Sequence, residues 1–305
     1  MTVGLSFGLI FPINSDLFKV LLKPALMIML FMVFLKSDII LIFHRIKNFK
    51  QVIFLVTMYM IVMPVFFYFL MNWFNENLAV AVLLLVAMPA GAASTVLTDI
   101  AGGNNELSAS IAITTSLVAP FTVTTLLWVL KIESLALNPL CMLIDLLVFI
   151  FIPLIASQVI KKNFRKEVER IIHLFSSINV MILSFSIFLI MGANRHIILT
   201  YSLSNILMKL LFLYLTFMAL HLIGYLIGYK EDKRGRISTA IGAAYMNNGL
   251  AILLAAIYFG PDILIFTILA EIPWNTLLGP FKKVVNGKEK KVLSEKGQVV
   301  ILENN

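Results

Sequence analysis

Two stretches of this chain place polar and flexible residues inside otherwise apolar sequence, about half a chain apart. Residues 88–115 (MPAGAASTVLTDIAGGNNELSASIAITT) combine a proline and small residues with hydroxyls, and residues 240–250 (AIGAAYMNNGL) carry two adjacent amides. Hydroxyl and carbonyl oxygens suit a hard cation such as Na⁺, whereas amide and hydroxyl donors suit an anionic group. The expected chemistry is therefore reversible binding of ions and of a polar solute.

The first stretch supplies oxygens for a cation site. Five of its hydroxyls are the candidate ligands of Na⁺: Ser94, Thr95, Ser108, Ser110 and Thr114. Ser110 and Thr114 are four residues apart and share one helix face. Any one of these hydroxyls taken alone is as well explained by contacts between helices as by ligand binding. The recurrence of the pattern in the second stretch favours ligand binding for the cluster as a whole.

The second stretch supplies amides, and a carboxylate follows it. We expect Asn247 and Asn248, together with Thr98 of the first stretch, to bind the substrate. Two amides in lipid would leave donors and acceptors unpaired, so they must face protein, water or a ligand. Glu271 lies in a later apolar run, and an intramembrane carboxylate is a candidate for coupling to Na⁺ or H⁺. A paired structural carboxylate is the alternative for Glu271.

Composition places these residues in a membrane protein. Apolar residues make up 60% of the 305-residue chain, charged residues 13%, and the mean hydropathy is +0.98. A soluble domain has about 45–50% apolar and about 25% charged residues. The net charge of +8 lies in short segments between apolar runs, which indicates a topology signal rather than a nucleic-acid partner. One cysteine, Cys141, excludes an intramolecular disulfide and a cysteine-rich metal site.

Ten apolar segments are candidates for crossing the membrane, which takes about 20 residues each. They lie near residues 2–12, 17–35, 52–71, 78–101, 107–130, 140–160, 171–191, 206–229, 237–258 and 262–280. The first is about half a span and has no basic start or cleavage site typical of a signal peptide. Either it enters the membrane obliquely or the true start lies upstream. Nine spans are therefore expected with one more in question.

The distribution of basic residues predicts the orientation. Most Lys and Arg residues follow the second, sixth, eighth and tenth segments, all on one side if there are ten spans. By the positive-inside rule this side, with the C-terminus, is cytoplasmic, and the protein is integral to the plasma (inner) membrane. Residues 284–305 are expected to form a polar cytoplasmic tail, whose lysines either meet anionic lipid or are simply solvated.

An even number of spans divides the chain into two inverted halves of five helices, residues 1–135 and 136–283. The fourth and ninth spans, broken near residues 88–101 and 237–258, hold equivalent places in the halves. Pro89 interrupts the first helix, and Gly91 allows another backbone to come close. Inverted repeats with discontinuous helices are typical of secondary transporters, whose site lies near the membrane midplane. We therefore expect alternating-access transport of a small organic anion.

Two other classes of function were weighed. The chain has no H-E-x-x-H or G-x-S-x-G motif and no paired intramembrane aspartates, so a membrane enzyme with a resident cofactor is not expected. A non-transporting sensor built on a transporter fold is compatible with the same residues. Sequence does not indicate the oligomeric state or the identity of the substrate.

At these residues the chain resembles the bile acid:sodium symporter family. The motifs that carry the resemblance are PAGAASTVLTDIAGGN and SIAITT in the fourth and fifth spans, GAAYMNNGL in the ninth, MPVFFYF in the third, and Trp274–Asn275 in the last. The resemblance implies a ten-span fold of a core and a panel domain, with the two broken helices crossing in the core. It also implies transport of an organic anion coupled to Na⁺.

Several positions depart from the family pattern of the first sodium site. Ser94 matches a hydroxyl ligand, but Thr95 replaces an asparagine. Counted without a gap, the ligands of the fifth span fall on Ser108 and Ala112. Ser110 and Thr114 take those roles only after a shift of two residues. The resemblance therefore implies that the first sodium site is kept only in part.

The second sodium site departs further. The acidic ligand of the ninth span, which serves both sites, corresponds to Gly242 here. The glutamines of the ninth and third spans correspond to Met246 and Tyr59. Loss of the carboxylate removes the only full negative charge, and a thioether is a poor ligand for a hard cation. We expect the second site to be absent and cation coupling to be weakened, with proton-coupled or uncoupled transport as the alternative.

Overall fold

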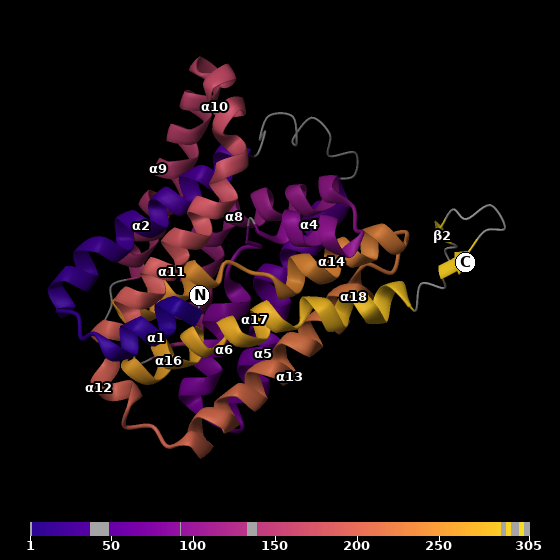
Figure 1. Cartoon of the computed structure of the whole chain (residues 1–305). Coiled ribbons are helices and arrows are strands. Elements are labelled where there is room, and N and C mark those ends of the chain that lie inside the picture. The colour runs from indigo at the N-terminus through magenta and orange to yellow at the C-terminus, as the bar shows by residue number, and fades with distance from the viewer. Residues whose placement is uncertain are drawn as a thin grey trace.

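The computed structural model describes residues 2–36, 49–91, 93–132, 139–287, 291–293 and 299–301. Helices occupy all ten apolar segments (Figure 1). From Thr2 to Ile171 the described helices are α1 (Thr2–Ile10), α2 (Ser15–Lys36), α4 (Phe49–Thr57), the π-helical turn η1 (Met58–Val62), α5 (Met63–Asn72), α6 (Glu76–Ala87), α7 (Ala93–Ala101), α8 (Asn105–Val129), α9 (Pro139–Asn163) and α10 (Arg165–Ile171).

The remaining helices are η2 (Ile172–Leu174), α11 (Phe175–Ala193), α12 (Arg195–Ile198), α13 (Leu203–Ile227), α14 (Lys233–Ala244), α15 (Asn248–Tyr258), α16 (Pro261–Leu269), α17 (Glu271–Thr276) and α18 (Leu278–Asn286). A short antiparallel pair, β1 (Lys291–Leu293) and β2 (Val299–Ile301), lies in the tail, with Val292 opposite Val300.

Within the described ranges, five helical stretches are long and apolar enough to cross a membrane by themselves. They are Lys50–Asn72, Asn105–Val129, Leu140–Asn163, Leu203–Ile227 and Pro261–Asn286. Arg165–Leu174 and Ser177–Ala193 become a sixth if they count as one span bent by 56°. α6, α7, α14 and α15 have 12 residues or fewer, so each rises only about 18 Å or less and cannot cross a core of about 30 Å alone.

The helices pack in two bundles. In the first bundle, α2 packs along α9 and α11, and α11 packs along α1. In the second bundle, α13 packs on α14, α5 and α16 pack on α6, and α7 and α14 pack on α8. Figure 1 shows α2, α9 and α11 on one side of the molecule and α4, α14 and α18 on the other. The two bundles meet where α8 packs on α9 and where α15, which belongs to the second bundle through α6 and α16, touches α2.

The short half-helices form the centre of the second bundle. Every residue from Leu78 to Ala87 of α6 is buried, as is every residue from Ile237 to Ala244 of α14. Such helices carry apolar or small side chains on all sides, which is typical of a helix enclosed by others. The first halves of the two segments predicted to be interrupted are therefore enclosed by protein, whereas Val96 and Ile100 of α7 are exposed.

Candidate functional site

The first helix break follows from a local rule. Met88 directly precedes Pro89 and is extended (φ −69°, ψ 149°), because the ring of a proline disfavours helical backbone in the residue before it. α6 therefore ends at Ala87, and α7 begins at Ala93. The second break has no proline. α14 ends at Ala244, and the side chain of Asn247 caps α15 by accepting from the backbone N of Leu250 at 3.1 Å.

The two breaks meet and exchange backbone hydrogen bonds. The backbone N of Gly91 donates to the carbonyl oxygen of Tyr245 at 2.9 Å, and that of Asn247 donates to Pro89 at 2.8 Å. Ala90 and Met246 form an antiparallel bridge. A β-carbon on Gly91 would lie 3.2–3.3 Å from the carbonyl oxygens of Met246 and Tyr245, so glycine permits this approach.

Two side chains satisfy the backbone groups that the pairing leaves over. The hydroxyl of Thr115 on α8 accepts from the backbone N of Ala90 at 3.1 Å. The indole Nε1 of Trp274 on α17 donates to the carbonyl oxygen of Met246 at 3.2 Å. Irregular backbone is stable away from water only when its polar groups are paired in this way. Sequence reasoning missed the role of Thr115, whose only signal is its place in a hydroxyl-rich helix.

The hydroxyls predicted on α7 differ in their surroundings. Ser94 is fully buried, and among the described residues its Oγ has no hydrogen-bond partner. Thr98 is also fully buried and donates to the hydroxyl of Ser108 on α8 at 3.0 Å. Thr95 is half-buried on the same helix. The structure thus brings Thr98 and Ser108 together and leaves the oxygen of Ser94 available.

Ser110 and Thr114, the hydroxyls of α8 predicted to bind Na⁺, donate to backbone carbonyls of the same helix. Ser110 donates to the carbonyl of Glu106 at 2.8 Å, and Thr114 donates to the carbonyl of Ser110 at 2.7 Å. Their protons are therefore engaged, but each oxygen keeps lone pairs that can coordinate a cation. Ser110 is buried and Thr114 half-buried. No contact of ordinary hydrogen-bond length between Ser94 and these two residues occurs in the described part of the chain.

The two predicted amides have different roles. The side-chain oxygen of Asn247 is used as the cap of α15. Asn248 is 4% exposed, and within the described ranges neither its Oδ1 nor its Nδ2 has a partner at hydrogen-bond distance. The hydroxyl of Tyr245, buried in the same break, also lacks one. An unpaired buried polar group costs free energy that a bound ligand can recover.

Glu271 lies beside this unpaired amide. It is the first residue of α17 and is 3% exposed, with its carboxyl group near the side chain of Asn248. The Nδ2 of Asn275 donates to Oε2 of Glu271 at 3.2 Å. In the part of the chain that the structure describes, no three His, Cys, Asp or Glu side chains gather into a metal site. Glu271 therefore stands as a single buried carboxyl group with amide neighbours.

The positions that depart from the family pattern of the second sodium site touch one another. A β-carbon on Gly242 would lie 3.2 Å from Cγ2 of Ile111 and 3.5 Å from Cε2 of Tyr59. Tyr59, in the π-helical turn of the third span, donates its hydroxyl to the carbonyl of Thr239 at 2.8 Å. An aromatic ring and an isoleucine thus fill the space beside Gly242. The side chain of Met246 is also buried.

The arrangement can bind a solute with both donors and acceptors. Ser94 offers a free oxygen near the start of α7, and Asn248 offers a free amide at the start of α15. Both helices begin at the crossing, where their backbone N–H groups carry partial positive charge. Such a site suits an anionic group together with a weakly held cation.

Known proteins resemble part of the chain. A family model described as Sodium Bile acid symporter family matches residues 23–201. A protein of Bacillus subtilis (strain 168), "Uncharacterized sodium-dependent transporter YocS", is 29% identical over 191 residues, which are 61% of this chain and 57% of that protein. The match thus covers just over half the length of this relative. The family match includes the first break and α8 and ends before the second break.

Proposed function

Because the chain belongs to the sodium bile acid symporter family, we propose that it is a secondary transporter of a small organic anion that works by alternating access. Membership of this family implies an integral membrane transporter of a small solute rather than an enzyme. The observation that carries the proposal is the pairing of two helix breaks in the buried centre of one bundle. A helix that only crosses lipid keeps all its backbone hydrogen bonds within itself, whereas broken helices at membrane depth are typical of transport sites.

The proposed architecture is two inverted repeats, residues 1–135 and 136–283, each with one broken helix, followed by a cytoplasmic tail at residues 284–305. Basic residues after α2, after α9, before α14 and after α18 support a cytoplasmic C-terminus in the plasma membrane. The first bundle would correspond to the panel and the second bundle to the core. Movement of one bundle against the other would expose the crossing to each side in turn.

The proposed substrate site is built on Asn247, Asn248 and Thr98. Asn248 is its centre, because its buried amide makes no hydrogen bond of ordinary geometry within the described residues and faces only the Glu271 carboxyl group, so a ligand there can gain hydrogen bonds. Asn247 fixes the start of α15 through its cap, and Thr98 fixes α7 against α8. The substrate class that fits is an anion small enough to bind between two helix starts.

We propose that sodium coupling is retained in weakened form. Ser94, Thr95, Ser108, Ser110 and Thr114 would provide hydroxyl oxygens for a partial first site. Support comes from the buried, unpartnered oxygen of Ser94. The ring of Tyr59 beside Gly242 argues against a second site, because it fills the space that a carboxylate at this position would need. Na⁺ held by neutral oxygens alone binds less strongly than Na⁺ held by a carboxylate.

A second candidate is coupling to protons through Glu271. The observation that favours it is a buried carboxyl group next to the unpaired amide of Asn248. When this carboxyl group gains or loses a proton, the charge beside the proposed substrate site changes. A third candidate function is a non-transporting sensor on the same fold, which would bind the anion without transporting it.

The test is uptake by the full chain in proteoliposomes, with a panel of radiolabelled carboxylates and sulfonates. We expect saturable uptake of at least one anion, raised only a few-fold by an inward Na⁺ gradient, with an apparent affinity about tenfold lower in Asn248→Ala. Asn205→Ala, which removes an exposed amide on α13, is the matched control and should transport normally. A steep Na⁺ requirement that Ser94→Ala and Thr114→Ala abolish would contradict weakened coupling.

Two further outcomes separate the alternatives. Uptake that follows a pH gradient, and loses this dependence in Glu271→Gln, would establish proton coupling. Saturable binding of an anion without any flux would establish a sensor and overturn the proposed transport.

A further inference from the structure

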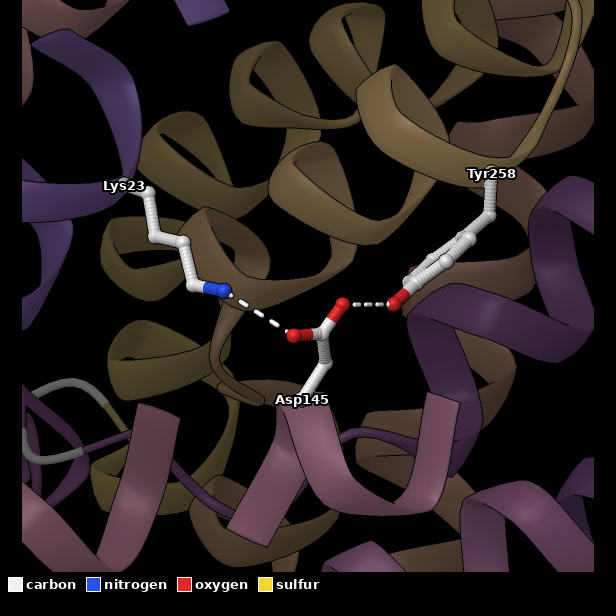
Figure 2. Close-up of polar contacts among 3 residues, drawn as sticks. All are labelled: Lys23, Asp145 and Tyr258. Carbon is white, nitrogen blue, oxygen red and sulfur yellow. Dashed lines mark hydrogen bonds and ion pairs between the residues drawn. The ribbon is translucent and has the colours of Figure 1, made fainter. Parts of the chain in front are cut away.

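Away from the two breaks, side chains from three helices meet at one carboxylate. The Nζ of Lys23 on α2 lies 3.0 Å from Oδ1 of Asp145 on α9, and the hydroxyl of Tyr258 donates to Oδ2 of the same carboxylate. Figure 2 shows Lys23 and Tyr258 reaching Asp145 from opposite sides. The side chains of Lys23 and Asp145 are 35% and 41% exposed. One acid is thus shared by a charged donor and a neutral donor.

The two contacts differ in what they join. Lys23 and Asp145 belong to α2 and α9, which pack along each other in the first bundle. Tyr258 is the last residue of α15 in the second bundle. The ion pair therefore lies within one bundle, whereas the hydrogen bond from Tyr258 crosses the boundary between the bundles.

Near Gly249, where α15 meets α2, the side chains that α2 contributes to the boundary are apolar. A β-carbon on Gly249, near the start of α15, would lie 3.2 Å from Cε of Met29 and 3.6 Å from Cδ2 of Leu26. Apolar contacts of this kind can slide or separate without leaving polar groups unpaired. The hydrogen bond of Tyr258 is directional, so it specifies one relative position of the two bundles.

The cluster lies at the ends of its helices that are remote from the basic segments. Lys23 precedes Lys36 by 13 residues, a rise of about 20 Å along α2, and Asp145 precedes Lys161 by 16 residues, a rise of about 24 Å. With the basic segments in the cytoplasm, the cluster lies toward the outer side of the membrane.

We propose that Tyr258 and Asp145 form a latch that holds the two bundles together on the outer side. This inference rests on the proposed alternating access and assigns residues to its outer gate. When the bundles separate, the hydrogen bond from Tyr258 breaks while Lys23 stays paired with Asp145. Opening therefore leaves no unpaired charge, which would be far more costly than the loss of one hydrogen bond. Removal of one hydrogen bond from a neutral donor to a charged acceptor should shift the equilibrium between the closed and the open boundary by about tenfold.

A similar cluster within the second bundle provides a matched control. Tyr201, two residues before the start of α13, donates its hydroxyl to Asp262 of α16. The Nζ of Lys209 lies 5.2 Å from the centroid of the Tyr201 ring and 3.9 Å from that of Phe266. Burial and the bond to Asp262 raise the pKa of Tyr201 to about 12, so its hydroxyl remains a donor at neutral pH. Tyr201→Phe removes the same kind of bond without affecting the boundary.

The test measures access of water to the boundary. Leu26 is 2% exposed between α2 and α15, so a thiol introduced by Leu26→Cys, in a Cys141→Ser background, reacts with an aqueous reagent only when the bundles part. The full chain is reconstituted in lipid nanodiscs and labelled with a membrane-impermeant methanethiosulfonate. We expect Tyr258→Phe to raise the labelling rate about tenfold and Tyr201→Phe to leave it unchanged.

A second variant and a second measurement make each outcome decisive. Asp145→Asn keeps an acceptor for Tyr258 but loses its charge, so its labelling rate should lie between those of the parent and of Tyr258→Phe. Equal rates in the parent, Tyr258→Phe and Tyr201→Phe would overturn the latch. Labelling requires no substrate. Faster labelling of Tyr258→Phe in a protein whose parent form shows no anion flux would therefore support the latch and contradict transport. Flux with unchanged labelling supports transport and overturns the latch.

Discussion

The two helix breaks use the same backbone pairing but surround it with opposite side-chain environments. At the first break, Thr115 accepts from the backbone of Ala90, and Thr98 donates to Ser108. At the second break, the amide of Asn248 and the hydroxyl of Tyr245 have no partner among the described residues. At the first break only the Oγ of Ser94 is buried without a hydrogen-bond partner among the described residues, whereas the second break leaves both an amide and a hydroxyl without one. We therefore expect the second break to contribute more of the ligand contacts.

The breaks also differ in what creates them. Pro89 interrupts the first helix locally, because the residue before a proline avoids helical backbone. The second break has no such residue and is held by the Asn247 cap, by the strand-like pairing with residues 89–91 and by Trp274. The second break thus depends on the first, and disturbing the pairing should affect both. Three predictions test this asymmetry.

The largest effect is expected at Gly91. A β-carbon there would meet two backbone carbonyl oxygens at 3.2–3.3 Å, whereas one on Gly249 would meet the mobile end of Met29 at 3.2 Å. Gly91→Ala should therefore reduce transport at least tenfold and lower the free energy of unfolding by about 1–3 kcal/mol, as overpacking does. Gly249→Ala should change both by far less, since the methionine can move and alanine favours a helix.

Thermal unfolding in detergent and uptake by proteoliposomes measure both quantities. Gly260→Ala, at a position with no atom within 4 Å of the added carbon, controls for the loss of a glycine. Similar losses in Gly91→Ala and Gly249→Ala would show that the backbone pairing is not what the first break contributes.

Much of this arrangement can be read from local sequence rules. The apolar segments predicted helices that the structure has, and the proline at position 89 predicted where one of them ends. The basic segments also predict a cytoplasmic C-terminus, and this orientation stays a prediction. Hydroxyls at positions 94, 98 and 108 were identified because such residues in an apolar chain are conspicuous.

What sequence could not provide is which polar groups find partners. Asn247 and Asn248 are adjacent and of the same type, yet one caps a helix and the other is unpaired, which depends on backbone direction at the break. The cluster at Asp145 joins residues 122 and 113 positions away, beyond any local pattern. The contact of Tyr59 with Gly242 likewise exists only after the halves have packed.

The next effect concerns the distinction between a completed and an open break. Thr115→Val leaves the backbone N–H of Ala90 unpaired, so we expect it to lower the free energy of unfolding by about 1–3 kcal/mol with little change in anion affinity. Asn248→Ala removes an amide that is already unpaired, so stability should stay the same or rise. Its affinity for the transported anion should fall about tenfold. Thermal unfolding and competition with labelled anion separate the two variants.

The opposite pattern would reverse the comparison between the breaks. If Thr115→Val weakens anion binding and keeps stability, the first break is the recognition half. If Asn248→Ala destabilises the protein without affecting affinity, its amide is paired within the protein in solution.

The smallest expected effect is a gain of sodium dependence at the second break. Gly242→Glu alone would crowd Ile111 and Tyr59, and Tyr59→Gln alone would lose the bond to Thr239. The double variant Gly242→Glu/Tyr59→Gln exchanges the ring for a smaller amide and adds a carboxylate, the full charge that a strong Na⁺ site requires. We expect uptake by the double variant to be several-fold higher in Na⁺ than in K⁺, with measurable ²²Na⁺ binding. Neither single variant should gain this dependence on Na⁺.

Gly242→Gln/Tyr59→Gln matches the size of the double variant without its charge and should show no gain. An equal gain in this control would mean that space, rather than the missing carboxylate, limits cation binding at the second break.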